Sequence, residues 1–186
     1  MFRAQVFLYI RSIMKRILFF ALLCCALGVS AQNYGNSYFM NVHKEGKLYF
    51  VKEMKMAHHG GAKARKLRYD FTHIDARDNV SITATCYTKG MINIDSLFVL
   101  LPDGRRFGYP IEKIYNEKKR FTWKNRFRAY IDSALWFEMY KNEEPFVIVV
   151  GSKNQEDVFF KDSAYSWKKR KKKMIFIQDL VELNRQ

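Results

Sequence analysis

The feature that most constrains the fold is an alternation of apolar and polar side chains with a period of two residues. In residues 79–88, Val80, Ile82, Ala84 and Cys86 fall on one face of an extended chain, and serine and threonine occupy much of the other. Such alternation predicts a β-strand with one buried face. The same pattern, or in one case an unbroken apolar run, predicts further strands at residues 46–56, 65–74, 92–101, 105–109, 121–131, 146–150 and 158–160.

Turn signals separate these segments. A Gly-Gly pair predicts a hairpin loop within residues 57–64, and Pro102-Asp103-Gly104 predicts a tight turn, because proline presets φ and glycine permits positive φ. Residues 33–41 are interpreted as a loose N-terminal arm and residues 110–119 as a charged connection. Many short strands divided by turns predict a mainly β domain, either a β-sandwich or an open barrel, with one or two helices packed on it.

Two segments favour helices. Asp132 is a good N-cap residue, and the helix formers after it predict a short helix that ends near Asn142. The apolar alternation continues through this segment, so a long strand is the alternative. A C-terminal helix is expected after Asp162 or Ser163, either of which can cap it. Its apolar residues recur at helical spacing on one face, at Trp167, Met174, Ile177 and Val181.

The N-terminal segment differs from the rest of the chain. An apolar run at residues 17–29 follows Lys15 and Arg16, and Ser30-Ala31 completes a small-residue end that a signal peptidase reads. The run is shorter than the roughly 20 residues that span a bilayer. We therefore expect residues 1–31 to be a cleavable signal peptide, with Met14 as an alternative start. Residues 32–186 are then one exported domain without a transmembrane span, placed in the periplasm, at the cell surface or in the medium.

The exported domain is predicted to be basic and to lack disulfides. Residues 1–31 contain two of the three cysteines, so Cys86 has no partner and is interpreted as a buried, inert thiol rather than a catalytic nucleophile. Residues 32–186 carry 29 basic and 18 acidic residues, a net charge of +11. This charge either keeps the domain soluble or favours an anionic partner, such as a lipid head group or an acidic glycan. Export disfavours nucleic acid as the partner.

The candidate binding residues form one run of cations near the C-terminus. Six consecutive cations cannot all be buried, and beside an anionic bilayer each contributes about 1 kcal/mol of binding free energy. Aromatic and apolar neighbours can insert beside them. The alternative is a solvated helix face on which the lysine side chains extend into water. The predicted anion-binding set is Trp167, Lys168, Lys169, Arg170, Lys171, Lys172 and Lys173.

The sequence carries no catalytic, nucleotide-binding or cofactor-binding motif with the usual spacing. His58 and His59 are weak candidates for a metal site, and adjacent residues rarely point at one ion, so neither a metal nor a cofactor is expected. His73 ends an apolar face and is interpreted as a histidine at the edge of the core. A catalytic site assembled from distant residues stays open, because such sites are defined by geometry.

Three Asp-Ser-apolar triplets resemble the acceptor motif for general O-glycosylation of exported proteins in Bacteroidota. The signal segment is also similar to those of many small exported proteins of unknown function in that phylum. The resemblance implies glycosylation at Ser96, Ser133 and Ser163, although two of the triplets coincide with expected helix caps. It implies nothing about fold or activity.

Export, the basic balance and the missing motifs together predict a non-catalytic domain that binds a partner at the cell envelope. One alternative is a hydrolase that acts on envelope polymers. The other is a structural subunit of an envelope assembly, for which the expected mark is an exposed apolar patch.

Overall fold

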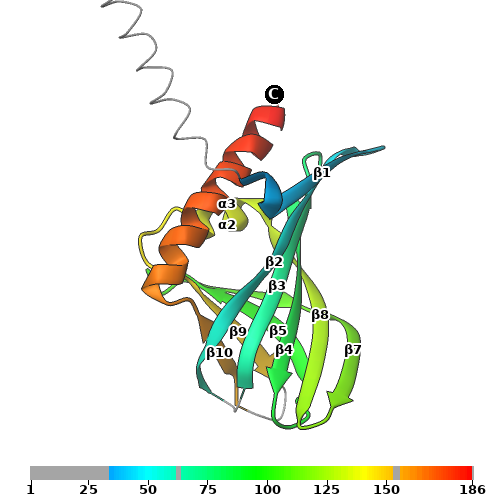
Figure 1. The fold of residues 1–186 in the computed structure, drawn as a ribbon, viewed down its shortest axis with the longest axis vertical. Helices are drawn as coiled ribbons and strands as arrows, with labels where there is room; N and C mark the ends of the chain where they lie inside the picture. Colours follow the sequence, from blue (N-terminus) through cyan, green and yellow to red (C-terminus); the bar gives the residue numbers. More distant parts are fainter. Residues whose placement is uncertain (1–33, 62–63, 153–155, 186) are drawn as a thin grey trace, which may run out of the picture. The chain divides into compact units, whose positions relative to one another are not determined.

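The structure is a computed structural model that describes residues 34–61, 64–152 and 156–185 (Figure 1). The predicted signal peptide, residues 1–31, and its alternative start at Met14 lie outside the described residues. Gly35 and the described residues after it belong to one structural unit. In chain order the elements are η1 (Tyr34–Ser37), β1 (Tyr38–His43), β2 (Gly46–Gly61), β3 (Ala64–Ile74), β4 (Asn79–Thr88), β5 (Ile94–Leu100), β6 (Arg106–Pro110), β7 (Glu112–Lys119), β8 (Thr122–Asp132), α2 (Ser133–Met139), β9 (Val147–Ser152), β10 (Val158–Lys161) and α3 (Ala164–Arg185).

The strands form one antiparallel sheet in the order β6-β5-β9-β10-β2-β3-β4-β8-β7, and β1 pairs with the first half of β2. The strands at the two ends of this order, β6 and β7, are consecutive in the sequence, and only Ile111 separates them. The chain therefore passes directly from one edge of the sheet to the other, and the sheet curls into a nearly closed, barrel-like form (Figure 1). The mainly β prediction is confirmed, and of its two alternatives the protein adopts the open barrel.

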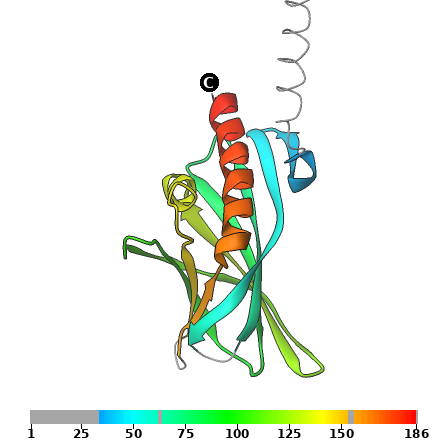
Figure 2. The ribbon, with the colours of Figure 1, turned by 60° about the vertical axis from the view of Figure 1, so that its left-hand side comes forward.

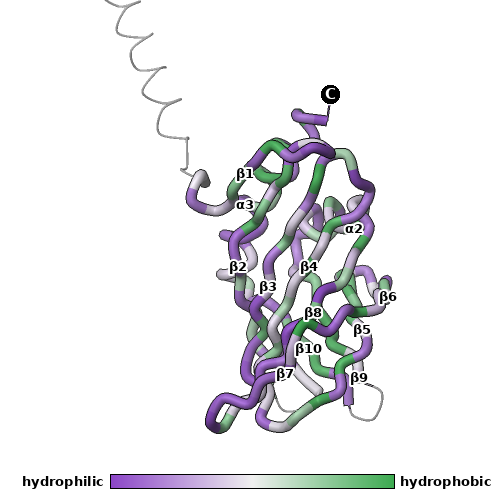
Figure 3. The backbone as a smooth tube through the Cα atoms, turned by 90° about the vertical axis from the view of Figure 1, so that its right-hand side faces the viewer, coloured by the Kyte–Doolittle hydropathy of each residue, from purple (hydrophilic) through white to green (hydrophobic). Residues whose placement is uncertain are grey.

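The inner face of β4 carries the predicted apolar residues, whereas in the first half of β2 the buried residues are Tyr49 and Val51, and Phe50 is exposed. Val80, Ile82, Ala84 and Cys86 are all fully buried, and the hydropathy colouring of β4 in Figure 3 includes these apolar residues. Helix α3 lies along β2 in both ribbon views (Figures 1 and 2). The helices complete the core that the curled sheet leaves open, because their buried residues join the same cluster as the inner face of the strands.

Aromatic side chains fill the space between the helices and the sheet. Tyr140 stacks on Trp167 with ring centroids 5.5 Å apart, and Phe146 meets Trp167 edge to face at 5.6 Å. Trp136 of α2 contacts Phe71 of β3 at 6.0 Å. Each such pair contributes about 0.5–1.5 kcal/mol beyond the burial of its apolar surface. The Trp167 contacts therefore hold α3 against the segment that joins α2 to β9, and the Trp136 contact holds α2 against β3.

Both predicted helices are present. The short helix α2 confirms the helical interpretation of its segment over the long strand, and Asp132 occupies the N-cap position. The Asp132 side chain makes no capping bond there; its carboxylate instead accepts a hydrogen bond from the Tyr109 hydroxyl at 2.9 Å. At α3, Ser163 is the capping residue, since its hydroxyl oxygen accepts a hydrogen bond from the Ser166 amide at 3.3 Å.

Two predicted connections are strands. Residues 110–119 were expected to be a charged connection, but Glu112–Lys119 forms β7, an edge strand with every side chain exposed. Its backbone pairs with β8, and charged residues are the usual protection of an edge against further pairing, so this strand needs no apolar alternation. The expected loose arm at residues 33–41 is likewise wrong for residues 38–41, which belong to β1 (Tyr38–His43). The hairpin loop within residues 57–64 is shorter than predicted because β2 continues to Gly61.

Candidate functional site

The predicted basic run lies in the first half of α3, and the helix divides it among different environments. Trp167 is only 3% exposed and packs between Tyr140 and Phe146. Its indole Nε1 donates a hydrogen bond to the Glu143 carbonyl oxygen at 2.7 Å. The prediction that Trp167 belongs to an exposed contact surface is therefore wrong, because the periodicity of the helix turns this residue into the core.

Arg170 also faces inward. Its side chain is 12% exposed, and it forms an ion pair with Asp162, whose side chain is 2% exposed. The guanidinium donates two further hydrogen bonds, to the Tyr69 hydroxyl at 3.2 Å and to the Lys55 carbonyl oxygen at 2.6 Å. Burial raises the pKa of the Asp162 carboxyl, and the Arg170 charge opposes this rise. Arg170 therefore ties α3 to β2 and β3, and Asp162 already neutralises its charge.

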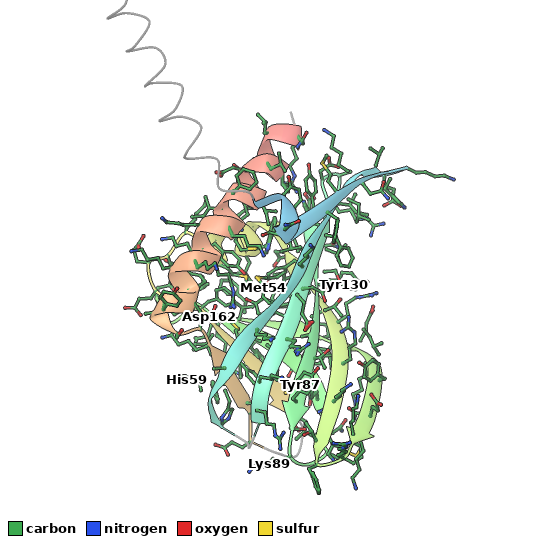
Figure 4. All side chains as sticks on the ribbon, viewed as in Figure 1. Met54, His59, Tyr87, Lys89, Tyr130 and Asp162 are labelled. Carbon is green, nitrogen blue, oxygen red and sulfur yellow. The ribbon has the colours of Figure 1, made fainter. Side chains whose placement is uncertain are left out.

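The other cations of the run fall into two groups. Lys171 pairs with Glu143, with Nζ 2.5 Å from Oε1, and Lys168 and Lys172 are exposed to solvent. Lys169, which is also exposed, and the half-buried Lys173 line a groove of about 380 Å³ together with residues of β2. This groove, called the α3 groove below, is lined by Glu53, Met54, Lys55, Tyr165, Ser166, Lys169, Arg170 and Lys173. In Figure 4, Met54 and Asp162 mark the strand and the helix start between which it lies.

The α3 groove has an excess of positive charge. Burial lowers the pKa of Lys173, and the nearby cations Arg170, Lys52 and Lys169 lower it further. Neither Lys169 nor Lys173 forms an ion pair with another described residue. Because like charges held close together repel, an anion in the groove would relieve a repulsion that the protein itself leaves in place.

The remaining lining residues define the chemistry of the groove. Glu53 is the acidic lining residue, and it pairs with Arg68 at 3.3 Å. Met54 supplies an apolar floor, whereas Tyr165 is 85% exposed at the rim. Tyr165 and Ser166 belong to the first turn of α3, where the partial positive charge of the helix end adds to that of the lysines. The groove therefore places lysine side chains of α3 beside an apolar surface.

Sequence reasoning found Lys169 and Lys173 but missed the strand side of the groove. Lys52, Glu53, Met54 and Lys55 lie at an irregularity in the pairing of β2 with β3, between Val51 and Met54. The loss of strict alternation at Lys52-Glu53 was the available signal in the sequence. It indicates a bulge, but not which distant helix the bulge faces.

The histidines do not converge on a metal. His58 and His59 are neighbours near the end of β2, so their side chains leave opposite faces of the strand, and His58 packs against Phe160. Within residues 34–61, 64–152 and 156–185, no three histidine, cysteine, aspartate or glutamate residues are grouped to hold an ion. His73 is 2% exposed; its Nδ1 donates a hydrogen bond to the Asn79 carbonyl oxygen at 3.0 Å, and its Nε2 accepts one from Arg185 at 3.2 Å.

The three proposed glycosylation sites differ in access. Ser163 is exposed at the start of α3, and Ser96 is half-buried on β5, where its hydroxyl donates to Asp95 at 2.6 Å. Ser133 is buried in the first turn of α2. Of the three, Ser163 is the position with the most room for a sugar.

No protein family, curated protein or solved structure matches this chain. In the part of the chain that the structure describes, no helix has both the length and the apolar character to cross a bilayer.

Proposed function

We propose that this protein is an exported, non-catalytic binding domain, and that its α3 groove holds an anionic group of a cell-envelope component. The observation that carries the proposal is that Lys169 and Lys173 line the same groove and that neither forms an ion pair with another described residue. Such a cluster destabilises the unliganded domain, and binding of an anion reverses that cost.

The residue types favour a phosphate over a planar carboxylate. A lysine ammonium is a compact point charge that suits a tetrahedral oxyanion, whereas an arginine fork suits a carboxylate. The one guanidinium in the groove, that of Arg170, is already bonded to Asp162, Tyr69 and Lys55. The apolar floor at Met54 would contact carbon atoms next to the phosphate. A phosphate-bearing lipid head group satisfies both requirements.

The test compares two pairs of lysines on the same helix. We expect the exported chain, residues 32–186, to co-sediment with vesicles of phosphatidylcholine and phosphatidylglycerol, but not with phosphatidylcholine alone. At about 1 kcal/mol for each cation, the double variant Lys169→Gln/Lys173→Gln should bind about 30-fold more weakly. The matched control, Lys168→Gln/Lys172→Gln, removes the same charge from the solvent-exposed side and should lose far less. Equal losses in the two variants would mean that net charge, rather than the groove, drives binding.

Export needs its own measurement. The intact mass of the native protein from fractionated cells should match residues 32–186, or that chain with sugar attached, and the protein should be found outside the cytoplasm. A full-length mass in the cytoplasmic fraction would contradict export and would restore nucleic acid as a candidate partner for so basic a domain.

A second candidate function, a structural subunit of an envelope assembly, is supported by β1. This strand is paired with β2 and exposes Phe39, Met40 and Val42, the last to 81%. Exposed apolar residues on an edge strand favour association with another chain. Sedimentation velocity of the full chain and of Val42→Lys should then show an oligomer that the substitution dissociates, whereas a concentration-independent monomer would dismiss this candidate.

A further inference from the structure

The outer face of the sheet carries a row of four residues that is distinct from the α3 groove. Phe50 of β2 pairs with Thr72 of β3, Thr72 with Ser81 of β4, and Ser81 with Tyr130 of β8. The row therefore runs aromatic, hydroxyl, hydroxyl, aromatic across four neighbouring strands. Figure 4 labels Tyr130 on β8.

The spacing of the strands fixes the width of this row. Strands lie about 4.8 Å apart and their side chains stand roughly perpendicular to the sheet, so the two aromatic residues are about 14 Å apart at their backbones. Phe50 is 45% exposed and Tyr130 is 42% exposed, whereas the threonine and serine between them are half-buried. The two aromatic residues therefore lie at the ends of the row, and the two hydroxyl-bearing residues lie between them.

A groove of about 240 Å³ lies over this row. Besides the four residues of the row, its lining includes Arg128 and Asn79. We call it the sheet-face groove. It falls below the roughly 300–1,000 Å³ of pockets for drug-sized ligands, so it suits a single ring rather than a larger molecule.

Arg128 brings a positive charge to the sheet-face groove. Burial raises the pKa of the Asp70 carboxyl, and the Arg128 charge is among those that lower it. Its Nε is buried without a hydrogen-bond partner among the described residues, and its guanidinium forms no ion pair with any of them. The other arginine of the lining, Arg77, is already paired with Glu45. A planar guanidinium with free donors matches a carboxylate, which it can bind through two parallel hydrogen bonds.

We propose that the sheet-face groove binds one acidic sugar unit, a pyranose that carries a carboxylate. The aromatic ring of Tyr130, two residues from Arg128 on β8, can present an apolar face to the C–H groups of such a ring. The hydroxyls of Thr72 and Ser81 can both donate and accept hydrogen bonds with its hydroxyl groups. Arg128 binds the carboxylate, and this contact separates an acidic sugar from a neutral one. The site is independent of the α3 groove, whose lysines favour phosphate.

The probes are methyl glucuronide, which carries the carboxylate, and methyl glucoside, which does not. NMR titration of the isotope-labelled full chain should show saturable shifts at Ser81 and Tyr130 with the glucuronide, and an affinity at least about tenfold lower for the glucoside. No saturable shift with the glucuronide, or equal affinity for the two sugars, would overturn the proposal.

Matched variants separate the groove from the charge and the aromatic content of the domain. Arg128→Gln should remove the preference for the acidic sugar, whereas Lys66→Gln, one charge less elsewhere on the same face, should keep it. Tyr130→Ala should weaken both sugars, whereas Tyr115→Ala, which removes a ring of the same 42% exposure outside this groove, should weaken neither. Sugar affinities are compared only among variants whose far-ultraviolet circular dichroism spectrum matches that of the unmodified chain, which shows that they are folded. If Arg128→Gln keeps the preference, the assignment is wrong.

One further variant distinguishes this proposal from the proposed function. Lys169→Gln/Lys173→Gln should bind the glucuronide like the unmodified chain, even though it loses anionic vesicles. A glucuronide affinity that falls with this variant would place the sugar in the α3 groove and would refute the sheet-face site.

Discussion

The buried pair of Arg170 and Asp162 permits a quantitative test of how α3 is held. Arg170→Met leaves the Asp162 carboxylate, 2% exposed, without its counter-ion. Removal of one partner of a buried ion pair costs about 3–5 kcal/mol. We take the lower end, about 3 kcal/mol, because the Arg170 side chain keeps some contact with water. In a domain of this length that loss corresponds to a melting temperature lower by roughly 6–12 °C.

The pH dependence of this loss identifies its cause. Burial already raises the pKa of Asp162, and without Arg170 it should rise further. As pH falls through that folded-state pKa, the Asp162 carboxylate gains a proton and no longer needs a counter-ion. The free energy of unfolding that Arg170→Met loses relative to the unmodified chain should therefore be smaller in acid. Urea unfolding followed by circular dichroism at neutral and acid pH measures both values. The matched control is Lys168→Met, which replaces an exposed cation on the same helix with an uncharged side chain. It should change the free energy of unfolding by less than about 0.5 kcal/mol.

A double variant completes the test. Asp162→Leu/Arg170→Met removes both charges, and its loss should be smaller than the sum of the two single losses by about 2 kcal/mol, because neither charge is left alone. Additive losses, or a loss below about 0.5 kcal/mol for Arg170→Met at neutral pH, would refute the argument that this pair anchors the helix.

Three further predictions concern single residues. Burial raises the pKa of Cys86 to about 12, so Ellman's reagent near pH 8 should modify this thiol only after unfolding. Burial, and to a lesser extent the Arg185 charge, lowers the pKa of His73. The folded protein therefore holds His73 neutral at a pH at which the unfolded chain already binds a proton, so His73 should reduce the free energy of unfolding as pH falls below about 6.5. In the variant His73→Gln, the urea midpoint of unfolding should depend less on pH between about pH 6.5 and 5. Lys173→Met should stabilise the unliganded protein by about 0.5 kcal/mol in urea unfolding while weakening vesicle binding, because it removes the repulsion that an anion would otherwise relieve.

Periodicity was enough to predict most strands and both helices. The alternation from Val80 to Cys86 correctly predicts the buried face of β4. A strand with one solvent-exposed face can bury its apolar residues only on the opposite face. It could not find β7, where backbone pairing at an exposed edge sets the structure and no side chain needs burial. It also could not choose between a sandwich and an open barrel, because that choice depends on which strands pair.

The candidate sites show a similar division. The run of six cations was visible in the sequence, but whether a cation faces the core or solvent depends on where α3 meets the sheet. Arg170 faces inward because its guanidinium donates hydrogen bonds to the Asp162 carboxylate and to the Lys55 carbonyl oxygen. Both acceptors lie outside α3, so the spacing of residues along the helix could not reveal them. The row from Phe50 to Tyr130 spans four strands, and each residue alone is an ordinary member of its own strand. Only the register brings them together.

Ile111 is the single residue between the edge strands β6 and β7, and this position is suited to dividing the chain into two fragments. Cleavage after Ile111 would cut no hydrogen-bonded ladder, since β6 pairs with β5 and β7 pairs with β8. The fragment that begins at Glu112 would still pair with the earlier fragment through β8 on β4, β9 on β5 and β10 on β2. Two separately expressed fragments should therefore reassemble into the native sheet, which makes this residue a natural point at which to split the protein into a complementing pair.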